Sequence, residues 1–383
     1  MGSRLLAVGK AWGLTMLGGC GNGSCTAVAL KSLFLLVQSM DDSPVSVWCL
    51  DFLKFEGDSL VLDGWALSPQ WARPAFTVNG VKMLSIFGYP RADLQRIMGS
   101  DDRAPTAGFH SECTGISSYL DGHECLEIRF CDETTLIPFD AGHSFFWPLV
   151  APTHAFPDPA RRKRVHGDIN ADGFIINGYS TFKKLEATLK SYSRNWGCFS
   201  RILDWGCGCG RVFRYLSQRT LSRLVGADVD TDNIEWCKRN FPDAEFHTLP
   251  LIPPTPLPSA TFDLLIGISV FTHLREQSQH AWLQELSRIC TKEGLLLMTI
   301  HGPIAEARAN LSKEQRRKWM SEGFIATGLN VDLAGAIPDD NYYVNSLHTA
   351  DYVRREWGKY FEILEIREGY VANHQDLVVM RKS

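Results

Sequence analysis

The chain has 383 residues, with 39 Lys and Arg against 43 Asp and Glu, and a formal net charge of -4 at pH 7. Hydrophobic residues account for 45% and charged residues for 21%, which excludes a wholly disordered chain and is ordinary for a globular protein with a sizeable core. The mild acidity argues against a protein whose main task is to neutralise nucleic-acid phosphates, so we expect no nucleic-acid partner. The length suggests two domains.

Residues 1–40 form a leader whose role the sequence leaves open. Its apolar stretches are interrupted by glycines or by Lys31, so they are weak as a signal segment and too short to span a bilayer. We interpret the leader as upstream sequence, with Met40 as the true beginning, and we expect no stable membrane insertion.

The cysteines are odd in number, eleven, and are scattered along the chain. They lack the paired spacing of a structural zinc site and do not look like the disulfide framework of a secreted protein. Reduced thiols in a cytoplasmic protein without a bound metal are the simplest interpretation.

Residues 41–150 read as short strands separated by turns. The stretch 59–67 is strand-like, 76–82 is a hairpin with Asn79-Gly80 at its tip, and 124–130 alternates apolar and polar residues. Strands at this spacing without a long helix predict a small β-sandwich domain.

Residues 151–170 are the predicted linker. Three prolines, Pro152, Pro157 and Pro159, break regular structure there, and we interpret the basic run 161–164 as solvated. Helical periodicity begins after it, in the domain predicted for residues 171–383.

Strands and helices alternate from Ser200 onward, which predicts an α/β domain with a Rossmann-like, doubly wound sheet. Near-continuous apolar runs such as 262–268 and 294–300 are typical of parallel strands buried on both faces. The expected strands are 201–204, 223–228, 262–268, 294–300, 361–367 and 376–381.

A glycine-rich turn between a strand and a helix is the sharpest signal in the sequence. It contains Gly206, Gly208 and Gly210, and glycines there let the backbone approach a ligand beside the free N–H groups of a helix start. A dinucleotide site typically has the pattern G-x-G-x-x-G. Here the third glycine, Gly210, comes one residue early and is followed by Arg211.

The carboxylates near this turn favour S-adenosylmethionine over NAD. Asp204 stands at the mouth of the turn, where it would repel a pyrophosphate and attract an ammonium group. Asp228 ends the next strand, where a carboxylate can accept hydrogen bonds from both ribose hydroxyls. The alternative is that both aspartates simply cap a tight turn.

With these motifs in order, the chain resembles the class I S-adenosylmethionine-dependent methyltransferases from residue 160 to 383. The motifs are residues 202–211, 225–230 and 262–274. The resemblance implies a seven-stranded sheet with an antiparallel final strand. It also implies a cofactor site in which Ser269 lies beside the cofactor, Asp228 and Val229 take the ribose, and the methionine end is held by Asp204 and the backbone of Gly206, Cys207, Gly208 and Gly210.

One motif departs from the family. Many relatives carry an acidic residue after the third strand for the adenine amine, but residues 246–251 contain none. Backbone groups and apolar packing are the alternative, and the adenine contacts stay open.

The front domain has a fainter likeness. Residues 62–67, the hairpin at 78–80, residues 91–94 and Gly108-Phe109 resemble a β-domain found beside methyltransferases and glycosyltransferases in bacterial cell-surface glycan gene clusters. The C-terminal segment 373–379 resembles the corresponding segment of methyltransferases from the same gene clusters. Both point to glycan modification and a sugar-containing acceptor.

Methyl transfer to oxygen usually benefits from a general base, and histidine is the first residue type to examine. His273 follows the fourth strand and His301 the fifth, and both strand ends should open on the ligand crevice. The alternatives are that His273 only caps or packs, that Asp351 is the base, or that no base is used.

Aromatic side chains suit a sugar ring, so Tyr342, Tyr343 and Trp357 are candidates for contact with the acceptor, although Trp357 has the spacing of a core residue. Residues 303–328 are expected to be an insertion after the fifth strand that either covers the acceptor or lies on the surface.

The sequence thus predicts a methyltransferase that acts on a small-molecule or carbohydrate-like acceptor, at oxygen. Its rivals are a catalytically silent cofactor-binding module and a nicotinamide-dependent oxidoreductase. A homo-oligomer is compatible with the sequence.

Overall fold

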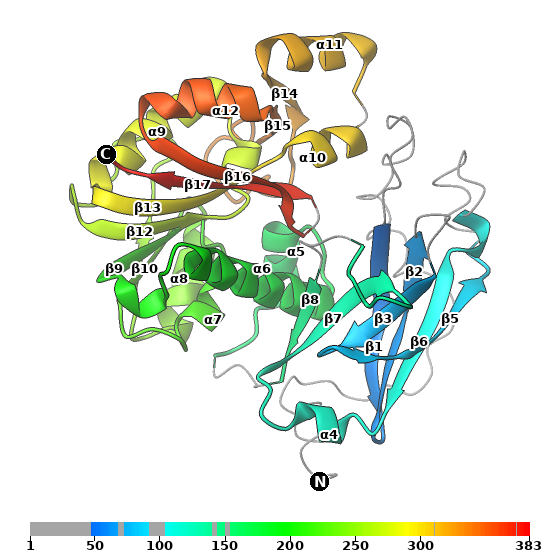
Figure 1. Cartoon of the computed structure of the whole chain (residues 1–383). Coiled ribbons are helices and arrows are strands. Elements are labelled where there is room, and N and C mark those ends of the chain that lie inside the picture. The colour runs from blue at the N-terminus through cyan, green and yellow to red at the C-terminus, as the bar shows by residue number, and fades with distance from the viewer. Residues whose placement is uncertain are drawn as a thin grey trace. The chain divides into compact units, whose positions relative to one another are not determined.

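The computed structural model describes residues 47–67, 73–91, 104–139, 144–149, 154–309, 311–372 and 374–383. The chain divides into two compact units, Met1–Thr153 and His154–Ser383, each described by itself (Figure 1). The predicted leader, residues 1–40, lies outside the described residues.

The first unit holds two antiparallel sheets in its described part. One has the order β1 (Val47–Glu56), β2 (Ser59–Leu67), β6 (Gly108–Thr114) and β5 (Leu84–Tyr89). The other has the order β4 (Val81–Lys82), β3 (Pro74–Val78), β7 (Cys125–Asp132) and β8 (Ser144–Pro148). The short helices are η2 (Ala104–Thr106) and α4 (Ser117–Leu120). The β3–β4 hairpin turns at Asn79 and Gly80, whose φ angles of 48° and 82° are those that a two-residue hairpin requires.

Aromatic side chains join these two sheets. Phe76 of β3 is fully buried, and its ring centroid lies 5.1 Å from that of Trp48 on β1 and 4.3 Å from that of Phe109 on β6. Since β3 belongs to one sheet and β1 and β6 to the other, the two sheets share one core. This arrangement agrees with the small sandwich expected from the strand spacing.

The second unit is built on one sheet with the order β11-β10-β9-β12-β13-β17-β16. Strand β17 runs antiparallel to both of its neighbours, and the other pairs are parallel. The predicted seven-stranded sheet with an antiparallel final strand is therefore confirmed. Its strands are β9 (Arg201–Trp205), β10 (Arg223–Asp228), β11 (Glu245–Thr248), β12 (Phe262–Gly267), β13 (Cys290–Ile300), β16 (Glu362–Val371) and β17 (Gln375–Arg381).

Helices cover both faces of this sheet (Figure 1). Helices α9 (Glu276–Ile289) and α12 (Ala350–Glu356) lie on one face, and α6 (Ala171–Ser191) and α8 (Thr231–Asn240) lie on the other. Trp357 at the end of α12 is fully buried, so the core-packing interpretation of its spacing is correct.

The remaining elements are shorter. They are η3 (Trp196–Cys198), α7 (Phe213–Leu216), η4 (Phe271–His273), η5 (Trp357–Lys359), and, within and after the predicted insertion, α10 (Pro303–Arg308), α11 (Lys313–Glu322), β14 (Phe324–Leu329) and β15 (Val344–His348). Strands β14 and β15 pair as a separate two-stranded sheet. No helix among the described residues is both long and apolar enough to cross a bilayer.

Helix α5 (Pro159–His166) corrects the prediction of a linker over residues 151–170. The Asp158 side chain accepts a hydrogen bond from the backbone N–H of Arg161, and Gly167 ends the helix with a φ of 78°. Proline at the first helical position removes no intrahelical hydrogen bond, so Pro159 begins this helix instead of breaking it.

The basic run on α5 is not merely solvated. Arg164 donates to the Asp230 carboxylate at 2.9 Å and to that of Asp232 at 2.7 Å, and Arg161 also donates to Asp232 at 2.7 Å. These ion pairs tie α5 to the N-terminus of α8.

Substitution of a central core side chain tests this packing. Leu265 on β12 is fully buried and pairs with Leu203 on β9 and Leu296 on β13. Leu265→Ala should lower the free energy of unfolding by about 2–5 kcal/mol because it leaves a cavity. Leu221→Ala, at a fully exposed side chain, is the control and should change it little. Urea denaturation followed by circular dichroism measures both; equal effects would contradict the proposed core.

Candidate functional site

The glycine loop follows β9 at the carboxyl end of the strand. Gly206, Gly208 and Gly210 have φ angles of 75°, 52° and 76°, a region that residues with a Cβ adopt only with strain. A Cβ at Gly206 would overlap Val270, and one at Gly208 would lie 2.7 Å from the side chain of Val165. Glycine is therefore needed here for backbone conformation and for close approach.

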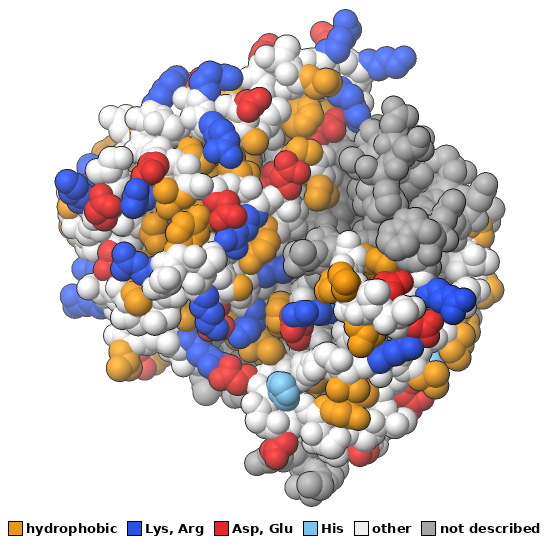
Figure 2. All heavy atoms as spheres, viewed as in Figure 1, with side chains coloured by type: hydrophobic (Ala, Val, Ile, Leu, Met, Phe, Trp, Pro, Cys, Tyr) orange, Lys and Arg blue, Asp and Glu red, His pale blue; other side chains and the backbone are white. Residues whose placement is uncertain are grey.

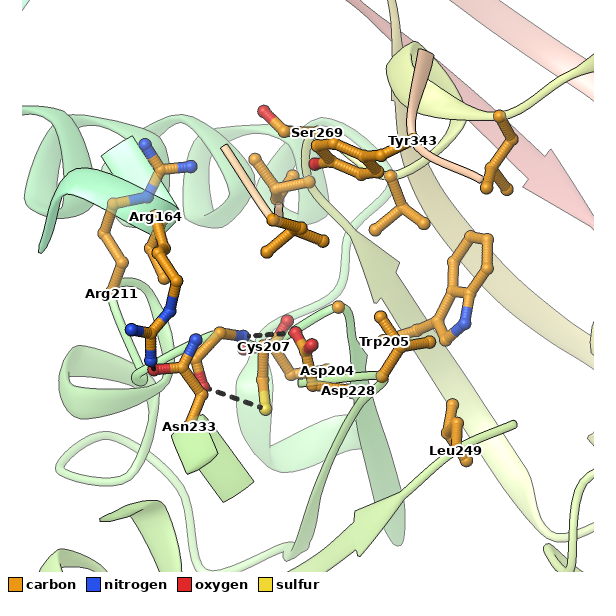
Figure 3. Close-up of a pocket in the computed structure, with 18 of the residues that line it drawn as sticks. Arg164, Asp204, Trp205, Cys207, Arg211, Asp228, Asn233, Leu249, Ser269 and Tyr343 are labelled. Atoms are coloured by element: carbon orange, nitrogen blue, oxygen red, sulfur yellow. Dashed lines mark hydrogen bonds between the residues drawn. The ribbon is translucent and has the colours of Figure 1, made fainter. Parts of the chain in front are cut away.

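A pocket opens beside this loop, at the carboxyl ends of β9, β10 and β12 (Figure 3). Its empty space is about 850 Å³, a figure that includes open solvent at the mouth. Its walls come from α5, the glycine loop, the end of β10, the segment after β12 and the segment before β15. The lining residues are Arg164, Val165, Asp204, Trp205, Gly206, Cys207, Gly208, Arg211, Val212, Asp228, Val229, Asn233, Leu249, Ile268, Ser269, Val270, Leu274, Trp282, Leu333, Tyr342 and Tyr343.

Asp204 is a buried carboxylate in this pocket. Its side chain accepts no hydrogen bond from the described part of the chain, although the residue is only 4% exposed. Burial and, to a smaller extent, the neighbouring Asp228 raise the pKa of Asp204 to about 7. The site therefore favours a ligand that brings a positive charge to this carboxylate.

Asp228 is held by the backbone. Its carboxylate accepts hydrogen bonds from the N–H of Gly208 at 2.7 Å and of Asp230 at 2.8 Å. Burial raises the pKa of Asp228 to about 6, and these hydrogen bonds act in the opposite direction. The carboxylate thus holds the glycine loop in place and also faces the pocket.

Ser269 stands across the pocket from the two aspartates (Figure 3). Its φ is 62°, a strained value for a residue with a side chain. Its backbone N–H donates to Thr299 Oγ1 at 2.8 Å, and Gln375 Nε2 donates to its hydroxyl oxygen at 2.6 Å. Two neighbouring strands, β13 and β17, therefore fix its position.

Three further predicted cofactor residues have different positions. Cys207 and Val229 line the pocket, whereas Gly210 does not and packs under the loop, where a Cβ would lie 2.9 Å from Phe241. Burial keeps the pKa of the Cys207 thiol well above its ordinary value, so this cysteine is a neutral wall residue. Among the described residues, no group of His, Cys, Asp and Glu could hold a metal ion.

Apolar packing is present where the sequence lacks an acidic residue for adenine. Leu249, just after β11, lines the pocket, and its N–H donates to the backbone oxygen of Asp228 at 2.8 Å. Leu249 therefore provides an apolar surface of the kind expected to pack against adenine in place of an acidic residue.

His273 and His301 do not line the pocket. The ring centroid of His273 lies 4.4 Å from that of Tyr343, a residue that lines the pocket, and 5.7 Å from that of His301. His301 in turn lies 4.8 Å from His374. The two predicted catalytic histidines are therefore close to each other, and His273 stands behind Tyr343.

The Nδ1 atom of His273 has two polar neighbours. It lies 3.2 Å from the backbone oxygen of Val344, to which a protonated Nδ1 donates, and 3.4 Å from Asn330 Nδ2, from which an unprotonated Nδ1 accepts. Burial lowers the pKa of His273 to about 4, and burial together with the neighbouring histidines lowers that of His301. Both rings are therefore neutral at pH 7.

Of the aromatic acceptor candidates, Tyr342 and Tyr343 line the pocket and Trp357 does not. The Tyr342 hydroxyl accepts a hydrogen bond from Trp282 Nε1 at 3.0 Å, which fixes its ring against the wall. The sequence missed Arg164 and Val165, because their helix was assigned to a linker. The signal was present as Asp158-Pro159 at the start and Gly167 at the end.

Comparison with known proteins agrees with this site. Residues 202–294 match the family of methyltransferase domains. Over 177 residues, the chain is 28% identical to the tRNA (carboxymethyluridine(34)-5-O)-methyltransferase alkbh8 of Xenopus tropicalis. The aligned stretch covers 46% of this chain and only 26% of the Xenopus protein.

Similar solved structures include a TehB-like SAM-dependent methyltransferase from Corynebacterium glutamicum, 19% identical, covering 52% of this chain and 87% of that chain, with a TM-score of 0.35. A geranyl diphosphate C-methyltransferase from Streptomyces coelicolor A3(2) is 12% identical, covering 56% of this chain and 79% of that chain, with a TM-score of 0.38. Likenesses this distant add nothing to the domain match.

Asp204→Asn should change how stability depends on pH. The pKa of Asp204 is about 7 in the folded chain and 3.8 ordinarily, so the folded state binds the proton more tightly. The stability that this contributes is complete below the ordinary pKa and is lost as the pH rises through the folded one. The variant does not ionise and should therefore gain stability relative to wild type on going from low to high pH, by on the order of 1 kcal/mol per unit of pKa shift.

Urea denaturation of both proteins at about pH 4.5 and about pH 8 measures this difference. Asp243→Asn, at an exposed carboxylate, is the control. A gap between Asp204→Asn and wild type that is the same at both pH values would show that the buried carboxylate does not titrate as described.

Proposed function

We propose that this chain, whose residues 202–294 form a methyltransferase domain with S-adenosylmethionine as its cofactor, transfers a methyl group to an oxygen of a small-molecule or carbohydrate-like acceptor. The observation that carries the proposal is the placement of two carboxylates, the buried Asp204 and the half-buried Asp228, on either side of a loop that needs glycines. The domain match supports methyl transfer as the reaction class. The proposal that the acceptor is small or carbohydrate-like, and that its oxygen is methylated, depends on the other residues that line the pocket or lie next to it.

The residues present fit this cofactor. The unpartnered Asp204 carboxylate would hold the ammonium group of the methionine end, which relieves the cost of an ionised carboxylate in a buried site. Asp228 would accept hydrogen bonds from the ribose, beside the apolar surfaces of Val229 and Leu249. The absence of a pyrophosphate-binding glycine pattern and the negative charge of Asp204 disfavour a nicotinamide dinucleotide in the same place.

When bound, the cofactor supplies an electrophilic methyl group, and the protein's part is to position the acceptor and exclude water. Ser269, held by Thr299 and Gln375, and Tyr343, packed on His273, form the wall opposite the carboxylates (Figure 3). We place the acceptor against this wall, because it carries hydroxyl and aromatic groups that suit a polar ring.

His273 is the proposed proton acceptor for an acceptor hydroxyl. Donation from Nδ1–H to the backbone oxygen of Val344 would leave Nε2 unprotonated, and the low pKa keeps the ring neutral at physiological pH. His301, packed against it, supports the ring and is the second candidate. Since His273 stands behind Tyr343, the role requires that ring to move or to relay the contact through one water.

A nucleic-acid acceptor is the second candidate function. It is favoured by the Xenopus relative, whose name describes a tRNA methyltransferase. The charge distribution favours the small acceptor. On the face shown in Figure 2, acidic and basic side chains are interspersed, and the formal net charge of the chain is -4, whereas a nucleic-acid-binding surface is usually basic. We also propose that the first unit assists in binding the acceptor. We further propose that the protein acts in the cytoplasm.

Asp228→Asn should weaken binding of S-adenosylhomocysteine by about tenfold to a hundredfold, because an amide accepts fewer hydrogen bonds and presents an N–H toward the donors of Gly208 and the ribose. Isothermal titration measures the affinity, with Asp243→Asn as the matched control and NADH as the control ligand. Tight NADH binding to the wild type would instead support the oxidoreductase, and an unchanged affinity in Asp228→Asn would remove Asp228 from the site.

His273→Ala should lower kcat by about a hundredfold or more while leaving S-adenosylhomocysteine affinity nearly unchanged, because it removes the proton acceptor and no cofactor contact. Transfer of a labelled methyl group to a panel of glycans, small molecules and bulk tRNA first identifies the acceptor. His123→Ala, at an exposed position of the first unit, is the control. Unchanged turnover in His273→Ala excludes it as the base, and transfer to no acceptor in the panel favours the silent module.

A further inference from the structure

One hairpin surrounds the ring of His273. Strands β14 and β15 pair antiparallel, and Val344 is the first residue of β15. The backbone oxygen of Val344 lies 3.2 Å from His273 Nδ1. The residue before it, Tyr343, lines the pocket and packs its ring against that of His273 (Figure 3). A single stretch of the hairpin therefore supplies both a pocket wall and a polar partner of the histidine.

Asn330, which follows β14, has a fixed side-chain amide. Its backbone N–H donates to the oxygen of Tyr343 at 2.8 Å, and its Oδ1 accepts a hydrogen bond from the N–H of Asp332 at 2.8 Å. Because Oδ1 is used in this way, the amide nitrogen faces the other side, 3.2 Å from Asn345 Oδ1 and 3.4 Å from His273 Nδ1. A local turn explains the place of the oxygen but not that of the nitrogen.

These contacts allow two tautomers of His273. With hydrogen on Nδ1, the ring donates to the Val344 oxygen, and the Asn330 amide donates to Asn345. With hydrogen on Nε2, Nδ1 accepts from Asn330 but then faces the Val344 oxygen, a second acceptor, at 3.2 Å. Burial lowers the pKa of His273, and hydrogen bonds with the backbone of Val344 and the side chain of Asn345 act in the opposite direction, as bonds that a ring N–H donates do. The network therefore favours hydrogen on Nδ1.

We infer that Asn330 and Asn345 are positioning residues for methyl transfer. By pairing with each other they keep the amide hydrogen of Asn330 away from Nδ1, so that His273 carries its hydrogen there and presents an unprotonated Nε2. The proton that the acceptor hydroxyl loses on methylation goes to Nε2, and donation to Val344 then stabilises the charged ring. The inference rests on the proposed function, in which His273 is the proton acceptor.

Nitrogen-15 NMR of the full chain, labelled at histidine alone, measures this tautomer without an acceptor. Protonated and unprotonated nitrogens of a neutral imidazole resonate far apart, and the spectrum of His273→Ala assigns the signals of this ring. At about pH 8, where the ring is neutral, we expect wild type to carry its hydrogen on Nδ1.

Two substitutions should move the tautomer in opposite directions. Asn345→Ala leaves the Asn330 amide without its acceptor, so we expect the ratio of tautomers to shift toward Nε2–H by about threefold to tenfold, the effect of one hydrogen bond. Adding Asn330→Asp should reverse the shift, because a carboxylate keeps the oxygen that Asp332 needs and has no hydrogen to donate. Asn341→Ala, at an exposed position before β15, is the control and should match wild type.

Three results would overturn the inference. They are a wild type with its hydrogen on Nε2, an unchanged tautomer in Asn345→Ala, and a shift that Asn330→Asp does not reverse. Thermal unfolding checks that each variant is folded, and Asn345→Ser, whose hydroxyl is too short to reach Asn330, replaces Asn345→Ala if that variant is not. The proposed function fails separately: turnover that survives His273→Ala excludes this base whatever its tautomer.

Discussion

The second unit depends on one constraint, the placement of two carboxylates, one buried and one half-buried, at the ends of adjacent parallel strands. Strands β9 and β10 are in register so that Asp204 lies opposite Gly226 and Trp205 opposite Ala227, which brings Asp204 and Asp228 to the same edge of the sheet. The loop after β9 must then turn within a few residues. The N–H groups of Gly206 and Cys207 both donate to the backbone oxygen of Ala227, at 2.7 Å and 3.2 Å. Glycines at three positions follow from this turn, and the pocket follows from the glycines.

The sequence predicted the sheet well because its strands are long apolar runs whose period and spacing are local properties. The glycine loop and Asp228 could be found for the same reason. The linker prediction was wrong because proline was interpreted as a helix breaker, whereas Pro159 stands at the first helical position, where the backbone N–H has no intrahelical partner to lose. The position of His273 behind Tyr343 could not be predicted, since it depends on β15, which is 71 residues away and reaches the ring through Val344.

The pocket is assembled from segments that enter by different routes. Helix α5 supplies Val165, which sits against Gly208, and its ion pairs with Asp230 and Asp232 hold it beside α8. The segment before β15 supplies Tyr342 and Tyr343 on another side. The two carboxylates therefore lie on strands of the sheet, whereas the wall opposite them is formed largely by segments that connect strands and helices. In α/β proteins, this division lets a common ligand site be combined with variable specificity.

The sheet order has a consequence for how the chain reaches its folded state. Strand β16 pairs only with β17 in the described structure, and β17 is the strand that joins it to β13. As β16 leaves the ribosome before β17, it has no partner in the sheet until the later strand has been made and inserted. During synthesis, both β16 and the outer edge of β13 are open strand edges, a state in which pairing with another chain competes with folding. Closing the sheet requires β13 and β17 to pair across about eighty positions of the chain, and non-local pairing of this kind forms slowly.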